Sequence, residues 1–160
     1  MHWSGLTVLT FEKYTPIAMV NQDPAAIHVK ADSPFKNVKG LFAHIKANPN
    51  KVVASGTGQG GSWHVALAGL MQADGVSPTS IRWVPSTGAA TALTDLAAGG
   101  VDFVSCSMPE PEALIKAGRI RSLVFFSPTR APNFPDVPTT DLTGRVNVAE
   151  RNARDRSRHT

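Results

Sequence analysis

The sequence lacks several features that would assign it to a familiar class. It has a single cysteine, Cys106, so no internal disulfide can form. It has no run of about 18 apolar residues, and residues 1–10 show neither a basic stretch before an apolar segment nor a small-residue cleavage site, so neither a membrane span nor a signal peptide is visible. With 160 residues, 42% of them hydrophobic and 18% charged, the chain has the composition of a globular domain with one core.

Most of the excess of positive charge is found in the last 16 residues. The pI is near 9.6, but residues 1–144 hold 11 basic against 10 acidic side chains, and residues 145–160 hold five Arg against two acids. This basic end has no aromatic residue that could stack on bases. We expect a disordered tail at 145–160 and no nucleic-acid partner.

Strand-like and helix-like patterns alternate along the remaining chain. Strands are expected at 17–20, 26–29, 52–54, 81–84, 101–106 and 122–126, and helices at 38–47, 62–73, 88–98 and 109–117. Strands that alternate with helices of about ten residues indicate βαβ units. The expected fold class is therefore α/β, with a mainly parallel sheet and helices on both faces.

The glycine-rich segment SGTGQGGSWH, residues 55–64, is the most informative motif. It follows a short strand and leads into a helix that Ser62 can cap, so it directs backbone N–H groups and the positive end of a helix dipole at one point. It contains no Lys, Arg, Asp or Glu. An anion bound there would be held by neutral donors, which favours a small oxyanion over a metal-bound polyphosphate.

Nucleotide motifs fit this segment poorly. No Gly-Lys-Ser/Thr follows, so it is not a Walker loop. Gly56, Gly58 and Gly61 have the spacing of the dinucleotide fingerprint, but Asp74 lies at a helix end and not at the tip of a second strand. A purely structural turn between strand and helix remains an alternative.

Catalytic constellations are weak as well. Ser62, His64 and Asp102 could be assembled into a Ser-His-Asp set, but Ser62 and His64 are two positions apart on a helix and point in different directions. The histidines show no metal-ligand spacing. We expect no enzyme, metal or cofactor, and we interpret His64 as a helix-capping or wall-lining residue and Trp63 as a possible pocket wall.

Two further loops should meet the glycine-rich segment at the carboxyl ends of the strands, where open α/β sheets bind their ligands. They are residues 85–88 and 105–109, and both are rich in small and hydroxyl side chains. Together the three loops indicate a site for a small ligand.

The order of these motifs resembles the substrate-binding receptors of tripartite tricarboxylate transporters. The resemblance covers about residues 11–140 and is carried by residues 11–20, 32–42, 45–49, 55–64, 84–96, 100–102 and 134–139. It implies one lobe of a two-lobed periplasmic-binding-protein-like fold that captures a di- or tricarboxylate and delivers it to a membrane permease. It also implies a periplasmic location.

The resemblance further implies a set of ligand-binding residues and a division of the chain. The set is Ser55, Gly56, Thr57, Gly58, Gln59, Gly60, Gly61, Ser62, Trp63, His64, Ser86, Thr87, Gly88, Ala89 and Ser107. Ser86 and Thr87 stand where the family usually has an aromatic residue and Lys. The expected division is a remnant of the first domain and hinge at 1–25, the ligand-binding domain at 26–126, a return crossover at 127–144 and the tail. Because the expected strands at 17–20 and 122–126 would lack the cover of the first domain, we expect a homo-oligomer, and because half of the clamp would be missing, we expect weak ligand binding.

Two other functions remain open at this point. One is the effector-sensing domain of a transcriptional regulator, although no helix-turn-helix pattern precedes Phe11. The other is an enzyme that binds a phosphate-bearing substrate at the glycine-rich loop.

Overall fold

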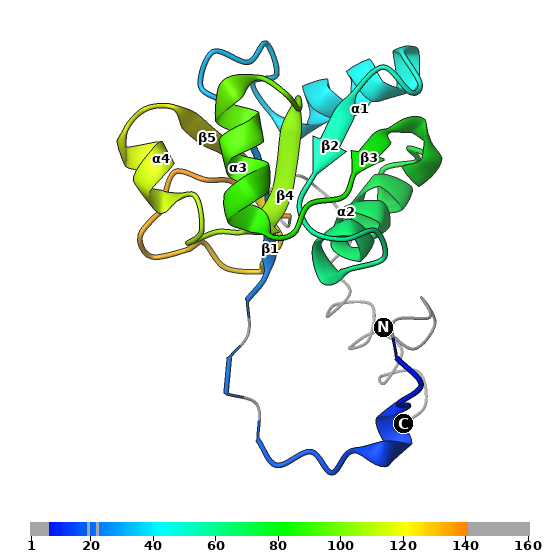
Figure 1. Ribbon diagram of the computed structural model, residues 1–160. Coiled ribbons are helices and arrows are strands. Elements are labelled where there is room, and N and C mark those ends of the chain that lie inside the picture. The colour runs from blue at the N-terminus through cyan, green and yellow to red at the C-terminus, as the bar shows by residue number, and fades with distance from the viewer. Residues whose placement is uncertain (1–6, 19, 22, 141–160) are drawn as a thin grey trace, which may run out of the picture.

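The structure is a computed structural model and describes residues 7–18, 20, 21 and 23–140. It contains one five-stranded sheet with helices packed on both faces (Figure 1). The strands are β1 (Ala25–Lys30), β2 (Val53–Ser55), β3 (Arg82–Val84), β4 (Phe103–Ser107) and β5 (Ile120–Phe125). The α-helices are α1 (Val38–Ala47), α2 (Ser62–Ala73), α3 (Ala89–Ala98) and α4 (Glu112–Lys116), and 3-10 turns lie at Phe11–Lys13 and Pro78–Ser80.

The sheet has the strand order β3-β2-β4-β1-β5. Strand β2 is parallel to β3 and β4, whereas β1 is antiparallel to both β4 and β5. Four strands therefore share one direction and β1 alone is reversed, so the expected mainly parallel α/β fold is confirmed. Because β1 is reversed, Ala25 at its start pairs with Ser107 at the end of β4, and the start of β1 lies beside the carboxyl end of β4.

Two apolar layers enclose the sheet. Helices α1 and α2 cover one face, where Phe42 and Met71 pack with Ile27 and Phe103 in one buried cluster. Helix α3 covers the other face, where Leu96 packs with Val104, and the partly buried Leu114 and Ile115 of α4 close that layer. These faces follow the helical spacing of apolar residues in the sequence.

The helix ends use local signals that are visible in the sequence. Asn37 caps α1, since its Oδ1 accepts a hydrogen bond from the Gly40 N–H at 2.8 Å. Helix α3 ends at Gly99, whose positive φ of 83° suits glycine. The predicted bounds of α1 and α2 are confirmed, and the other elements start or end within one to three residues of the prediction.

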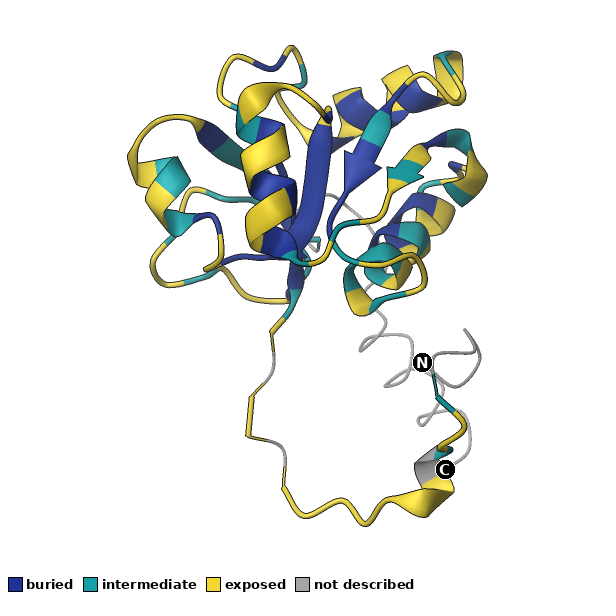
Figure 2. Cartoon of the chain, viewed as in Figure 1, coloured by how far each residue is buried: buried dark blue, intermediate teal, exposed yellow. Residues whose placement is uncertain are grey.

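One predicted strand is wrong. The described residues of the segment 17–20 form no strand, and Ile17 and Val20 are 97% and 95% exposed. This N-terminal arm, residues 7–18, 20 and 21, extends away from the domain (Figure 2). Its apolar run resembles a strand locally, but a strand needs a pairing partner, and the described chain supplies none. The predicted tail at 145–160 lies outside the described residues.

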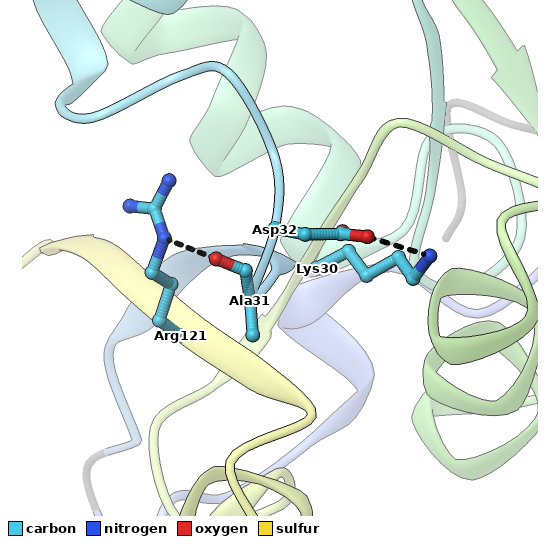
Figure 3. Close-up of polar contacts among 4 residues, drawn as sticks. All are labelled: Lys30, Ala31, Asp32 and Arg121. Carbon is cyan, nitrogen blue, oxygen red and sulfur yellow. Dashed lines mark hydrogen bonds and ion pairs between the residues drawn. The ribbon is translucent and has the colours of Figure 1, made fainter.

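Arg121 organises the edge of the sheet opposite the three loops (Figure 3). Its Nε donates a hydrogen bond to the Ala31 carbonyl at 3.3 Å, and its Nη2 donates to the carbonyls of Ser33 and Phe35. Lys30 and Asp32 form an exposed ion pair at 3.1 Å beside it. This edge is thus occupied by contacts that hold the connection between β1 and α1.

In the part of the chain that the structure describes, no helix has the length and apolarity needed to cross a membrane. Within the same residues, no cluster of three or more His, Cys, Asp or Glu side chains could hold a metal ion.

Candidate functional site

The carboxyl ends of β2, β3 and β4 lie at one edge of the sheet, on the lower side of the domain in Figure 1. The three loops predicted from the sequence leave the sheet there and lead to α2, α3 and α4. The start of β1 reaches the same edge because this strand is reversed. The structure therefore brings the predicted loops together and adds a segment that the prediction did not include.

The first two residues of the glycine-rich loop are part of the packed interior. Ser55 is 1% exposed, and its Oγ donates to the Val84 carbonyl at 2.8 Å. At Gly56, an added Cβ would lie 2.4 Å from the Ser105 carbonyl oxygen and 2.9 Å from the Trp83 ring. These residues fix the loop against β3 and β4, so glycine is required at position 56 by close packing.

Trp83 and His64 hold the middle of the loop. The Trp83 indole Nε1 donates to the Thr57 carbonyl at 3.1 Å, and the ring centroids of Trp83 and His64 lie 4.7 Å apart. His64 Nδ1 accepts the Gly60 N–H at 3.1 Å. Burial lowers the pKa of His64, which favours the neutral ring that this bond requires. His64 is thus a residue that shapes the loop.

The N-terminus of α2 has no side-chain cap. The N-cap residue is Gly61, and Ser62, which was expected to cap the helix, is its first helical residue. The N–H groups of Ser62, Trp63 and His64 have no acceptor four residues earlier within the helix. The positive end of the helix dipole therefore points at solvent beside the exposed Gly58 and Gln59.

The second loop packs against the first. Ser86 Oγ donates to the Gly88 carbonyl at 2.9 Å, and the Ser86 N–H lies 3.5 Å from the Thr57 carbonyl. Thr87 Oγ1 lies 3.3 Å from Thr91 Oγ1, and Ala89 is buried. These hydroxyls are engaged within the loop, and Gly88 caps α3 without a side-chain bond.

Ser107, which was predicted to lie in the third loop, is the last residue of β4 and is 1% exposed. Its N–H and Oγ both donate to Glu110 Oε2, at 3.1 and 2.8 Å. Ser107 lies at the predicted edge, but its hydroxyl is engaged by the carboxylate of Glu110.

A cavity of about 700 Å³ lies beside the first turn of α2. Ser62, Trp63 and Ala66 form one wall, and the start of β1 and the segment after β5 form the other. Residues 23–25 and 125–132 were missed by sequence reasoning. The direction of β1 decides their position, and neither hydrophobic periodicity nor turn residues carry that information.

The geometry does not support the dinucleotide-binding or the Ser-His-Asp interpretation of the loop. Asp74 is the C-cap of α2, at the end of the helix opposite to the glycines. Asp102 precedes β4, and its Oδ2 accepts the Val53 N–H at 2.7 Å, so it is engaged at the far end of the strands. Neither a ribose-binding carboxylate nor a Ser-His-Asp set is formed.

Comparison with known proteins gives a consistent result. The family model described as "Tripartite tricarboxylate transporter family receptor" matches residues 3–152, a longer region than the one the sequence motifs indicated. A UPF0065 protein of Pseudomonas sp. (strain P51) is 33% identical over 126 residues, which is 79% of this chain and 37% of that protein. The chain thus spans well under half the length of this curated relative.

Solved structures agree in fold. A ligand-free TctC solute-binding protein from Polaromonas has a TM-score of 0.76 and 33% identity, over 90% of this chain and 48% of that one. A protein of R. palustris solved with adipate has a TM-score of 0.67 and 28% identity, over 76% and 40%. The matched family is one of transporter receptors, and the Polaromonas relative is a solute-binding protein. The chain therefore belongs to the tripartite tricarboxylate transporter receptor family, TctC.

Proposed function

We propose that this chain forms one half of a solute receptor and holds a carboxylate group of a small organic acid. The observation that carries the proposal is the uncapped N-terminus of α2, which opens beside a cavity of about 700 Å³. Backbone N–H groups at a helix N-terminus bind anions, and the helix dipole adds to the attraction.

The donors of this site are fewer than the motif suggests. The Gly60 N–H donates to His64, and the Gly61 N–H donates to the Gly58 carbonyl at 3.0 Å. The remaining donors of the helix start are the amides of Ser62, Trp63 and His64, with the Ser62 hydroxyl next to them. Since residues 55–64 contain no charged side chain, the carboxylate is held by neutral groups.

The remaining predicted residues support this anchor or extend it. Residues 55–57 and 60 position the helix start, and residues 58 and 59 border it. Ser86 to Ala89 and Ser107 form the adjoining rim at the carboxyl ends of β3 and β4. We retain them as part of the proposed site. To contact the ligand, the Ser86 and Ser107 hydroxyls would have to give up their present hydrogen bonds to the Gly88 carbonyl and to Glu110.

The family supplies the wider proposal. One R. palustris relative was solved with adipate, a dicarboxylate. By analogy, the whole receptor captures a di- or tricarboxylate in the periplasm and delivers it to a membrane permease. This chain contributes the lobe that contains α2.

A proline at position 62 tests the anchor with little disturbance of the helix. Proline is favoured at the first helical position, and Gly61, with φ −70° and ψ 170°, has the extended conformation that a following proline requires. Ser62→Pro deletes one N–H and the hydroxyl, whereas the control Ser62→Ala deletes the hydroxyl alone.

Calorimetric titration with adipate should show that Ser62→Pro binds about tenfold or more weakly than Ser62→Ala, because one hydrogen bond to a charged acceptor is lost. Equal affinities of the two variants, or no binding of any carboxylate by the unmodified chain, would refute the proposed site.

A further inference from the structure

The cavity beside α2 has a chemistry of its own. We propose that it receives an alkyl or aryl body attached to the carboxylate, so that this lobe alone binds acids with an apolar body more tightly than polyhydroxylated acids and gains no affinity from a second carboxylate. The inference rests on the proposed function, because the carboxylate is taken to lie at the amides of Ser62 and Trp63, two residues that line the cavity.

The walls of the cavity are largely apolar. They are formed mainly by Trp63, Ala66, Phe125, Phe126, Pro128 and Pro132. Trp63 packs against the buried cluster of α3 and β4, and Phe125 is only 8% exposed, so both rings are held in place. Burial of methylene or ring carbons against a rigid apolar wall strengthens binding, whereas burial of hydroxyl groups without a hydrogen-bond partner weakens it.

The two charges in the lining cancel, so the cavity provides no net positive charge for a second carboxylate. The charged side chains among the described lining residues are Asp23 and Arg130, which have opposite signs. Arg130 Nη1 donates to the carbonyls of Pro135 and Val137, so this side chain is held at the turn that follows β5. Asp23 repels any additional carboxylate that enters the cavity. The three loops at the edge, residues 55–64, 85–88 and 105–109, contain no Lys or Arg.

The dimensions agree with a small ligand. Pockets for small molecules have volumes of about 300–1,000 Å³, and this cavity has about 700 Å³. One turn of α2 separates Ser62 from Ala66, so an acid bound at the first amides can extend along that turn between Trp63 and Phe126. In a whole receptor, any second carboxylate of the ligand would be recognised outside this cavity.

Calorimetric titration of the full chain with acetate, butyrate, hexanoate, adipate and citrate tests the inference. Each added methylene that is buried should tighten binding about three- to fourfold. Hexanoate should therefore bind at least about fivefold more tightly than acetate, adipate no more tightly than hexanoate, and citrate most weakly of the six-carbon acids.

A smaller gain from acetate to hexanoate, or adipate or citrate binding more tightly than hexanoate, would overturn the inference and leave the carboxylate anchor intact. If hexanoate binding were equal in Ser62→Pro and Ser62→Ala, the anchor itself would fail, and the inference with it.

A charge reversal provides an independent gain-of-function test. Asp23 is exposed, so Asp23→Lys should fold normally and place a cation at the cavity. It should tighten adipate binding about tenfold while changing hexanoate binding about twofold or less, since only adipate has a second carboxylate to pair. Asp95→Lys makes an equal charge change on the exposed side of α3, and it should not change the affinity for adipate relative to that for hexanoate. An equal effect of Asp23→Lys on both acids would place the body of the ligand outside the cavity.

Discussion

Ser105 and Trp63 join the sheet to the proposed anchor. The Ser105 hydroxyl on β4 donates a hydrogen bond of 3.1 Å to the carbonyl of Trp63, in the first turn of α2. Ser105 is fully buried, so this bond forms away from solvent competition. The amides that are proposed to bind a carboxylate are thus positioned by the central strand of the sheet and not by the loop alone.

Removal of this bond should lower the stability of the protein. We expect Ser105→Ala to lower the free energy of unfolding by about 1 kcal/mol, because a hydrogen bond is lost and the hydroxyl leaves a small void. Urea denaturation measures the change. The control is Thr94→Ala, which removes an exposed hydroxyl bond to the Ala90 carbonyl and should change stability by about 0.5 kcal/mol or less. Equal effects of the two substitutions would contradict the positioning role.

Two glycines of the same loop should differ in their tolerance of an added methyl group. At Gly56 the added Cβ would meet the Ser105 carbonyl at 2.4 Å, whereas at Gly58 nothing lies within 4 Å of it. Gly56→Ala should therefore destabilise the protein by about 1–3 kcal/mol through overpacking, and Gly58→Ala should be close to neutral. Thermal unfolding of the two variants checks this difference, and a tolerated Gly56→Ala would mean that the close packing of the loop is wrong.

His28 should make the protein sensitive to acid. It is fully buried in β1, with Nδ1 2.9 Å from Ser122 Oγ, and its Nε2 has no hydrogen-bond partner among the described residues. Burial lowers the pKa of His28 from 6.5 to about 4, and the nearby backbone of Cys106 and Ser107 opposes this shift in part. The folded state thus binds its proton less readily than the unfolded state does.

The stabilisation linked to His28 is complete above pH 6.5 and is lost as the pH falls toward 4, because the unfolded chain takes up the proton first. The loss amounts to about 3 kcal/mol. His28→Leu should lose correspondingly less stability between pH 7 and pH 4 in urea denaturation, while His44→Gln, at an exposed position of α1, should behave like the unmodified protein. Parallel pH profiles of His28→Leu and the unmodified protein would contradict this assignment.

The sequence predicts the elements of this fold well for physical reasons that are local. The apolar spacing of Val38, Leu41, Phe42 and Ile45 defines the buried face of α1, and Asn37 marks its start. The segment 17–20 has the same local signature as a strand, yet it is exposed, because pairing depends on a partner elsewhere. The reversal of β1 is not encoded in periodicity for the same reason.

In the candidate site, too, only the features that depend on local signals could be predicted from the sequence. Residues 55–64 could be located from glycine content and the following helix, since both are local signals. The engagement of Ser107 by Glu110 and of Gly60 by His64 depends on side-chain geometry that a pattern does not contain. Asp23 and the segment 125–132 reach the cavity only because β1 is reversed and β5 lies beside it.

The exposed N-terminal arm leads to a prediction about assembly. Val8, Ile17 and Val20 are 90–97% exposed, and apolar side chains in an extended segment favour association. We expect the isolated chain to form a homodimer or larger assembly, and Ile17→Asp combined with Val20→Asp to shift it toward the monomer. Light scattering over a range of concentrations measures this, and a monomer at high concentration would contradict the expectation.

The amides at the start of α2 are the groups proposed to bind a carboxylate. Titration of the ¹⁵N-labelled chain with hexanoate, followed by amide chemical shifts, tests this proposal most directly. We expect saturable shifts that are largest at Ser62, Trp63 and His64. In the chain that carries Asp23→Lys, the affinity for hexanoate should change by no more than about twofold. Shifts that cluster at the opposite edge of the sheet, around Lys30 and Arg121, or no saturable shift at the start of α2, would contradict the proposal.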